Sequence, residues 1–410
     1  MPKDTMKILH IAIRVIATAS LLIASPLVKP SSATAATSAS WAQPGYDAAG
    51  TYYNPAERVI NAASVGKLKL KWKFPRIYSN RCLSETHGPL VIDNRVLAVD
   101  DWLTAYAPAT GKRLWRAPVD LRNQEVRGFT SVGKLAVVAT RTCGRPANPD
   151  AAIYAFDATN GALRWQLRDD VTPDLMLAAD GMILFAGVSV EGAPQAMYGV
   201  EASSGRKRWT QLGTAERQLW PSDVVAGSRV TVRHSNDGAD RSDVIDIRTG
   251  TTLWTAPRNW DAIAASASGD KVFMHDYDLY EGTLQELVHA VDARTGVVKW
   301  TARHNGAQAA TDGRHLYISG WDSVISCFDT ATGKQLWTRD TGLTTWQPVR
   351  AGGLVWVPRW YTGRMPLALN ASTGAKLTVS SALGNTQHIR AIVGGHLYAE
   401  MGSSIGVFAP

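Results

Sequence analysis

The stretch Val291-Asp292-Ala293-Arg294-Thr295-Gly296-Val297-Val298-Lys299-Trp300 decides the fold, because it recurs with small changes along most of the chain. In most copies a short apolar run ends at an acidic or amide residue, a Gly follows, and a Trp stands four residues later; the first copy is only partly preserved, Ala107 takes the acidic position in the next, and the last has Thr378 in place of the Trp. The closing positions of the copies are 72, 115, 165, 209, 254, 300, 337 and 378, so the repeat recurs every 37 to 50 residues. A period of about 40 to 50 residues with four short strands per unit is typical of a β-propeller.

The residues of the repeat each have a structural reason. The Asp side chain hydrogen-bonds turn backbone, and the Gly supplies the positive φ of a tight hairpin. The Trp that follows is large and carries one N–H donor, so it suits a contact between one blade and the next. We interpret these Trp residues as structural: Trp72, Trp115, Trp165, Trp209, Trp254, Trp300 and Trp337.

The two ends of the repeat array predict how the ring closes. The last copy is followed by three candidate strands, Ile389–Val393, His396–Glu400 and Ile405–Phe408, with no fourth. The missing strand is Leu68–Phe74, and pairing it with the carboxyl-terminal strands removes exposed sheet edges. The sequence therefore predicts an all-β fold, an eight-bladed propeller of four-stranded antiparallel blades closed by its terminal strands. Seven blades stay possible if the short interval around Gly333 is a degenerate unit.

The amino terminus has a different composition. Basic residues Lys3, Lys7 and Arg14 precede an apolar run, and small residues follow at positions 33 and 35. The run is shorter than the ~20 residues that a membrane-spanning helix needs, which disfavours an uncleaved anchor. We expect a signal peptide over 1–35, a leader segment over 36–64 and the propeller over 65–410, in a secreted or extracytoplasmic protein without a membrane span after cleavage.

Charge limits the possible partners. The formal net charge is +8, and removing residues 1–35 lowers it to +5. The densest basic run, Gly205-Arg206-Lys207-Arg208, lies in a repeat turn. Nucleic-acid binding needs a basic patch or an aromatic-basic surface, so we expect no nucleic-acid partner. We expect a monomer that contacts an envelope or extracellular protein or polymer.

The leader and the first repeat carry a family resemblance. Residues Trp41 to Pro55, together with Val65 to Phe74 and the repeated Asp-Thr-Gly-Trp pattern, resemble the quinoprotein alcohol dehydrogenase-like family of PQQ-like repeat propellers. The resemblance covers essentially the whole mature chain. It implies the propeller fold, but the same blades serve pyrroloquinoline quinone (PQQ) dehydrogenases and non-catalytic scaffold propellers alike.

The resemblance also implies what a PQQ enzyme would require. Such sites hold the quinone between a Trp and a disulfide of two adjacent cysteines, with Ca²⁺ bound by Glu, Asn and Asp. This chain has three cysteines, at 82, 143 and 327, and none is adjacent to another. We therefore predict no cofactor and no metal site, while PQQ and Ca²⁺ stay possible without support from site residues.

Loops at one end of the blades are the default place for function, since they surround the central channel. These are the loops from an outer strand to the next inner strand and from a second strand to a third. Packing is the alternative role for each of their aromatic residues. The candidate ligand-binding residues are His87, Arg141, Arg145, Trp220, His234, Trp321, Trp346, Arg359, Trp360 and His388.

Two cysteines fall on the same predicted face. Cys82 precedes the first inner strand and Cys143 lies in a loop of the next blade, so a disulfide between adjacent blades is possible in an exported protein. Cys327, in an apolar strand, is expected to be a buried free thiol. Three unpaired thiols are the alternative.

These observations favour an exported, non-catalytic propeller that acts as a binding or scaffolding module through its loop face. Whether the chain is an enzyme stays open, although no phosphate loop, Gly-x-Ser-x-Gly elbow or His-Glu-x-x-His motif is present. The alternatives are a PQQ-dependent alcohol or sugar dehydrogenase with a reduced site and a carbohydrate-active propeller enzyme, whose paired carboxylates would leave no local sequence signal.

Overall fold

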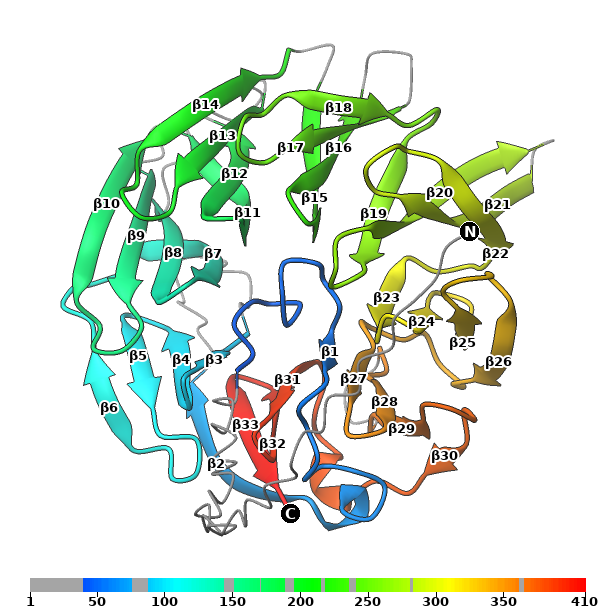
Figure 1. Cartoon of the computed structure of the whole chain (residues 1–410). Coiled ribbons are helices and arrows are strands. Elements are labelled where there is room, and N and C mark those ends of the chain that lie inside the picture. Colours follow the sequence, from blue (N-terminus) through cyan, green and yellow to red (C-terminus); the bar gives the residue numbers. More distant parts are fainter. Residues whose placement is uncertain are drawn as a thin grey trace, which may run out of the picture. The chain divides into compact units, whose positions relative to one another are not determined.

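Eight sheets stand around a central axis as the blades of a propeller (Figure 1). The computed structural model describes residues 40–75, 88–143, 151–169, 171–188, 195–214, 218–235, 241–280, 283–360 and 365–410. They belong to one compact unit, Ser38–Pro410. The expected eight-bladed all-β architecture is confirmed.

The first four blades follow one another along the chain, and each has its four antiparallel strands in sequence order from the axis outward. Their strands are β3 (Leu90–Ile92), β4 (Arg95–Val99), β5 (Leu103–Tyr106) and β6 (Arg113–Arg116) in blade 1; β7 (Gln124–Val132), β8 (Leu135–Thr142), β9 (Ala151–Asp157) and β10 (Leu163–Asp169) in blade 2; β11 (Thr172–Ala179), β12 (Met182–Val188), β13 (Ala196–Glu201) and β14 (Lys207–Leu212) in blade 3; and β15 (Gln218–Ala226), β16 (Arg229–Ser235), β17 (Ser242–Asp246) and β18 (Thr252–Thr255) in blade 4.

The next three blades repeat this order, and the last one joins both ends of the array. Their strands are β19 (Trp260–Ala265), β20 (Lys271–Tyr280), β21 (Thr283–Asp292) and β22 (Val298–Arg303) in blade 5; β23 (Gln308–Thr311), β24 (His315–Ser319), β25 (Val324–Asp329) and β26 (Gln335–Asp340) in blade 6; β27 (Val349–Ala351), β28 (Leu354–Val357), β29 (Leu367–Asn370) and β30 (Lys376–Leu377) in blade 7; and β31 (Ile389–Val393), β32 (His396–Met401), β33 (Ser404–Ala409) and β2 (Lys69–Pro75) in blade 8.

Ring closure occurs where β2 pairs antiparallel with β33, from Lys69 opposite Ala409 to Pro75 opposite Ser404. The short strand β1 (Tyr53–Asn54) adds to blade 7 in parallel with β27. Two 3₁₀ helices, η1 (Val65–Lys67) and η2 (Ser381–Leu383), are the helical elements of the described chain. Within that part, no helix is long and apolar enough to cross a membrane.

The strand directions define two faces. Each inner strand begins at the face that carries the outer-to-inner and second-to-third loops, which we call the loop face. It ends at the opposite face, which carries the hairpin turns between the inner and second strands and between the third and outer strands, and which we call the turn face.

The repeated Trp and Gly residues form the contacts between neighbouring blades. The Trp209 Nε1 donates a hydrogen bond to the Ile247 carbonyl of the next blade at 2.9 Å, and its ring lies against Gly250. Gly250 has a φ of +71°, and a Cβ there would lie 2.7 Å from the ring. The packing of the ring on a Gly recurs between other blades, although the Trp115 Nε1 has no hydrogen-bond partner among the described residues: Trp72 with Gly111, Trp115 with Gly161, Trp165 with Gly205, Trp254 with Gly296, Trp300 with Gly333 and Trp337 with Gly374.

We predict that Gly250→Ala destabilises the protein more than Gly181→Ala. Both glycines have nearly the same positive φ, +71° and +73°, but a Cβ at Gly181 meets nothing within 4 Å. The two variants therefore share backbone strain, and only Gly250→Ala displaces an indole, at a further cost of about 1 to 3 kcal/mol. Denaturant unfolding midpoints measure the difference; equal losses would show that the indole contact is dispensable.

The leader segment crosses the centre of the ring, drawn in blue in Figure 1, and hydrogen-bonds all eight blades in order. Its partners are mostly near the ends of the inner strands, so it closes the channel toward the turn face. The contacts are Trp41 with Val91; Ala42 with Ser131; Gln43 with Ser131 and Ala178; Ala48 with Val225; Ala49 with Ala265; Thr51 with Thr311; Tyr52 with Arg350; and Asn54 with Ile392.

We predict that Asn54→Ala weakens the attachment of the leader. The Asn54 side chain is 2% exposed, its Nδ2 donates to the Ile392 carbonyl at 2.8 Å and its Oδ1 accepts from the Ala56 N–H. Loss of these bonds leaves buried polar groups unpaired, at a cost of about 1 to 3 kcal/mol. Asn61→Ala is the control, because the hydrogen bonds of the Asn61 side chain to described residues stay within the leader. Asn54→Ala alone should show faster proteolysis of the leader and a lower unfolding midpoint.

Candidate functional site

Four of the predicted residues come together on the loop face. Trp346 stacks on Trp360 with ring centroids 4.1 Å apart and planes at 16°, and its centroid lies 4.5 Å from that of His388. Trp321 lies 5.5 Å from Trp360, centroid to centroid. We call Trp321, Trp346, Trp360 and His388 the indole cluster.

Two loops of blade 7 hold the stacked pair Trp346 and Trp360 in place. The loop before β27 pairs with the loop after β28, through a bridge between Thr345 and Arg359. The backbone N–H of Trp346 donates to the Pro358 carbonyl at 2.9 Å, and the backbone N–H of Trp360 donates to the Thr344 carbonyl at 2.8 Å. Backbone pairing therefore fixes both stacked indoles before any ligand is present.

The cluster remains open to solvent. Trp321 is 58% exposed and Trp360 is 40% exposed. Indoles combine a large apolar face with one hydrogen-bond donor, and they are enriched where proteins bind partners. A group of two exposed indoles and the half-buried Trp346 is therefore a better candidate for binding than the single aromatic residues elsewhere on the described surface.

The other predicted residues do not join the cluster. Trp220 is 44% exposed on blade 4, across the strand pair from Arg233. The Arg141 Nε donates to the Glu125 carboxylate at 2.5 Å. His234 is buried, with its Nε2 3.0 Å from the Asp243 carboxylate. Arg359 contributes its backbone to the loop pair, and its Nε donates to the Met365 carbonyl. His87 and Arg145 lie outside the described residues.

The cysteines are in two different states. Cys143 is disulfide-bonded, and Cys327 is a buried free thiol whose pKa burial raises to about 12. Cys82 lies outside the described residues, so its pairing with Cys143 stays a prediction.

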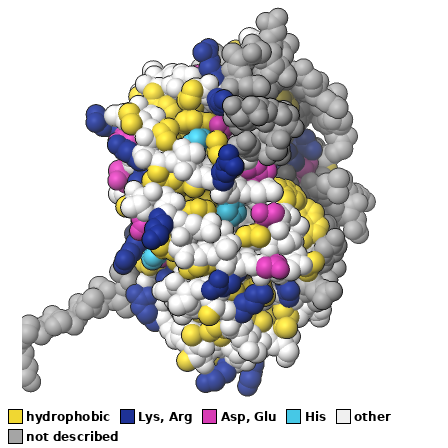
Figure 2. Space-filling view, turned by 90° about the vertical axis from the view of Figure 1, so that its right-hand side faces the viewer, with side chains coloured by type: hydrophobic (Ala, Val, Ile, Leu, Met, Phe, Trp, Pro, Cys, Tyr) yellow, Lys and Arg dark blue, Asp and Glu magenta, His cyan; other side chains and the backbone are white. Residues whose placement is uncertain are grey.

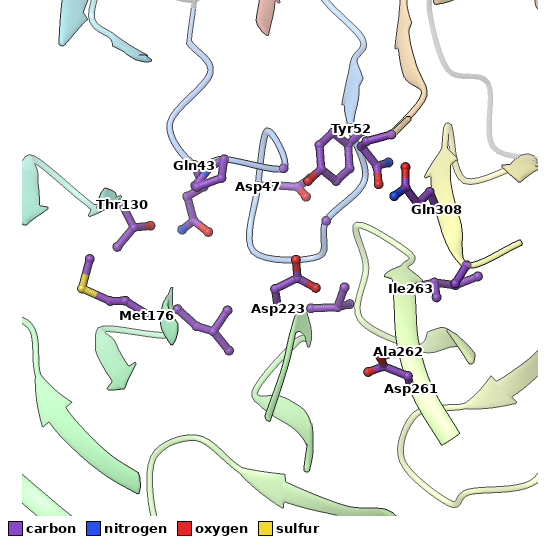
Figure 3. Close-up of a pocket in the computed structure, with 17 residues that line it drawn as sticks. Gln43, Asp47, Tyr52, Thr130, Met176, Asp223, Asp261, Ala262, Ile263 and Gln308 are labelled. Carbon is purple, nitrogen blue, oxygen red and sulfur yellow. The ribbon is translucent and has the colours of Figure 1, made fainter. Parts of the chain in front are cut away.

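A pocket of ≈ 240 Å³ lies in the channel beside the indole cluster. The leader forms its floor with Gln43, Asp47 and Tyr52, and the inner strands form its walls (Figure 3). Gln347, the residue after Trp346, lines it as well. On the other side of the leader a wider hollow of ≈ 470 Å³ lies among the turns of the turn face. The leader thus separates the two hollows.

Three carboxylates from different elements face this pocket: Asp47 from the leader, Asp223 from β15 and Asp261 from β19. Asp223 lies where the pairing of β15 with β16 shifts register between Pro221 and Val225. A bulge of this kind reorients side chains, which here brings an acidic residue of an otherwise apolar strand to the pocket.

Partial desolvation by the channel walls disfavours the charged form of all three carboxylates, although Asp223 keeps an exposed surface. It raises the pKa of Asp47 and of Asp223, and it raises the pKa of Asp261 to about 6. The charge of Arg233, whose Nε lies 3.8 Å from Asp261 Oδ1, lowers the pKa of Asp261 and so offsets part of this rise. The nearby charge of Asp223 raises the pKa of Asp261 further. Asp47 accepts hydrogen bonds from the Thr51 N–H and hydroxyl.

Sequence reasoning missed this pocket. Two signals for it exist in the sequence: the leader is rich in aromatic residues, which is unusual for a linker, and Asp223 and Asp261 interrupt apolar inner strands. Neither signal shows that the leader occupies the channel, because that depends on contacts between segments far apart in the chain.

A second buried polar group lies at blades 5 and 6. The His275 Nε2 lies 3.3 Å from Glu286 Oε2, and burial lowers the pKa of His275 and of His304 to about 4. Both imidazoles are therefore neutral at pH 7. Even so, no group of three or more His, Cys, Asp or Glu side chains in the described ranges is arranged to hold a metal ion.

The chain matches known proteins along most of its length. A family model described as outer membrane protein assembly factor BamB matches residues 62–283, 240–375 and 284–404. A tetrathionate hydrolase from Acidithiobacillus ferrooxidans is 26% identical over 365 residues, covering 69% of this chain and 72% of that protein.

Solved structures share the fold at low sequence identity. BamB from Moraxella catarrhalis superposes with a TM-score of 0.57 and 17% identity, covering 84% of this chain and 98% of that one. A europium-containing methanol dehydrogenase gives a TM-score of 0.60 and 15% identity, with 90% of each chain covered. The quinohemoprotein alcohol dehydrogenase ADHIIG from Pseudomonas putida HK5 gives 0.61 and 12%, with 90% and 80% covered.

The residues of the channel do not fit PQQ, the cofactor that the family resemblance implies. PQQ carries three carboxylates, and the pocket itself presents the carboxylates of Asp47, Asp223 and Asp261. None of the lining residues that the structure describes is Lys or Arg. Like charges in a partly desolvated site repel strongly. The pocket volume of ≈ 240 Å³ is also below the about 300 to 1,000 Å³ typical of sites for larger ligands.

We predict that Asp261→Asn stabilises the protein at pH 7.5 and has little effect at pH 4. The folded-state pKa of Asp261, about 6, lies above its ordinary value of 3.8. Ionisation of Asp261 therefore lowers the stability of the folded protein as the pH rises from 3.8 to about 6. Since the side chain is one third exposed, a gain of ~1 to 2 °C in Tm is expected at pH 7.5. Asp120→Asn should give no gain, because Arg122 lowers the Asp120 pKa. Thermal scans at both pH values test this; a gain at pH 4 as large as that at pH 7.5 would contradict it.

Proposed function

The chain belongs to the family of PQQ-like repeat propellers described as outer membrane protein assembly factor BamB, and from that premise we propose that it is a non-catalytic binding module for a protein partner in the cell envelope. The proposed binding surface is the loop face. The family description names an assembly factor, a role that depends on binding other proteins. The signal-like segment 1–35 supports export of the chain to the compartment where such a partner would be found.

The exposed indole cluster carries this proposal. Trp321 and Trp360 present apolar surface on the loop face, and the loop that carries Trp360 is held by backbone pairing with the loop that carries Trp346. Residues that dominate protein interfaces are commonly Trp, and rigid side chains lose little entropy on binding. A preorganised aromatic group of this kind has no evident role in the propeller core, because other Trp residues make the contacts between blades.

The enzymatic alternatives receive less support from the channel. Oxidation with PQQ requires a trianionic cofactor in a pocket lined by carboxylates. The related tetrathionate hydrolase is named for a substrate that is a dianion, and the same repulsion would oppose its entry here. A carbohydrate-active role would use paired carboxylates, and Asp223 and Asp261 are available, but we derive no reaction from them.

We predict that the double variant Trp321→Ala, Trp360→Ala loses its protein partner. Truncating two exposed indoles at an interface centre should weaken binding at least about tenfold. Trp220→Ala is the matched control, because Trp220 is exposed on another blade, outside the cluster. The wild-type protein, the double variant and Trp220→Ala are each crosslinked in envelope fractions from the source cells, and the amount of crosslinked partner is quantified.

Two outcomes would contradict the proposed function. One is an unchanged set of crosslinked proteins in the double variant, with the fold intact by circular dichroism. The other is turnover of tetrathionate, an alcohol or a polysaccharide by the purified protein that is abolished by Asp223→Asn.

A further inference from the structure

The channel pocket contains an excess of hydrogen-bond acceptors. Besides the carboxylates of Asp47, Asp223 and Asp261, it is lined by Gln43, Gln308 and Gln347. The Gln43 Nε2 donates to the Ala178 carbonyl at 2.8 Å and the Gln347 Nε2 donates to the Ala309 carbonyl at 2.5 Å. The amide donors of these two residues are therefore engaged by backbone.

One acceptor in the pocket lacks a donor. The side-chain oxygen Oε1 of Gln308 is buried and accepts no hydrogen bond from the described residues. A buried acceptor without a partner is costly, and such groups in native structures point to a missing partner. Gln308 as a whole is only partly buried, so rotation of its amide can turn this acceptor toward a guest with several N–H donors.

The local charge is the opposite of that of the whole protein. The chain has a formal net charge of +8, and Lys and Arg side chains are spread over the face in Figure 2. No described lining residue of the pocket is Lys or Arg. Among the neighbouring cations, Arg390 is paired with the buried Glu400, and Arg233 lies 3.8 Å from Asp261. Neither Asp47 nor Asp223 forms an ion pair with a described cation.

We propose that the pocket binds an ammonium or guanidinium group, and that its source is a Lys or Arg side chain of the protein partner. This inference rests on the proposed function and specifies the partner chemistry. Ammonium offers three N–H donors and guanidinium five, which matches an acceptor-rich pocket. The pocket volume of ≈ 240 Å³ suits one long side chain better than a large cofactor.

The indole cluster explains why a side chain of a protein, rather than a free amine, is the source. Trp346 immediately precedes the pocket residue Gln347, so this member of the cluster adjoins the pocket wall through the chain. The residues next to the Lys or Arg of a docked segment would pack on the indoles, and Asp322 beside Trp321 adds a further negative charge. The leader closes the channel toward the turn face, so the side chain enters from the loop face.

The test uses the full mature protein and a short peptide with one Lys between two Phe residues. Isothermal titration compares this peptide with the same peptide carrying acetyl-lysine, which removes the charge and adds an acetyl group. It also compares spermidine as a free amine. We expect the Lys peptide to bind, and we expect acetylation or the double variant Asp223→Asn, Asp261→Asn to weaken binding at least about tenfold.

Matched variants separate the possible results. Asp101→Asn, Asp120→Asn removes the same charge from the loop face of blade 1 and should leave peptide binding unchanged. Equal binding of the Lys and acetyl-lysine peptides would overturn the proposal. Spermidine that binds as tightly as the peptide, with both unaffected by Trp360→Ala, would overturn the assignment to a partner's side chain. Loss of the crosslinked partner in the indole variant but not in the Asp223, Asp261 variant would leave the proposed function standing and reject this inference.

Discussion

The packing of each indole on the glycine of the next blade is the constraint on which this structure depends. A blade cannot bury both of its faces alone, and the Trp closes the gap to its neighbour only because Gly leaves room for the ring. At Gly250 a Cβ would lie 2.7 Å from the Trp209 ring, so the contact excludes other residues. Where the last repeat has Thr378 in place of Trp, Gly66 at the start of the array lies beside its carbonyl oxygen. The ring is therefore continuous through its closure.

The leader gives this ring its functional asymmetry. It hydrogen-bonds successive blades near the ends of their inner strands and closes the channel toward the turn face. What remains on the loop side is a small pocket with an acidic lining, next to indoles that are partly exposed. A pseudo-symmetric ring with eight similar blades thus acquires one site, because a single segment without symmetry crosses its centre.

The sequence predicted the ring well because the repeat is a local pattern with a known structural cause. The period, the Asp-Thr-Gly turns and the three strands after Thr378 that lack a fourth favoured eight blades closed by the terminal strands, and the family match confirms the resemblance to PQQ-like repeat propellers. Trp321, Trp346, Trp360 and His388 were placed on one face by strand order alone, and the structure brings them together.

Other parts of the site could not be predicted in this way. Strand order gives the height of a residue along a blade but not its side-chain partners, so His234 was grouped with the ligand-binding candidates although it is buried against Asp243. The channel pocket depends on the path of the leader and on the irregular pairing around Asp223. Such features arise from contacts between distant segments, for which a repeat pattern carries no information.

The most direct test of this account is a crystal structure of the mature protein with the Lys peptide bound. We predict density for the peptide across the indole cluster on the loop face, with the ammonium nitrogen within hydrogen-bonding distance of the Asp223 or Asp261 carboxylate. A peptide bound on the turn face, or an anion in the channel pocket in place of the ammonium group, would contradict it.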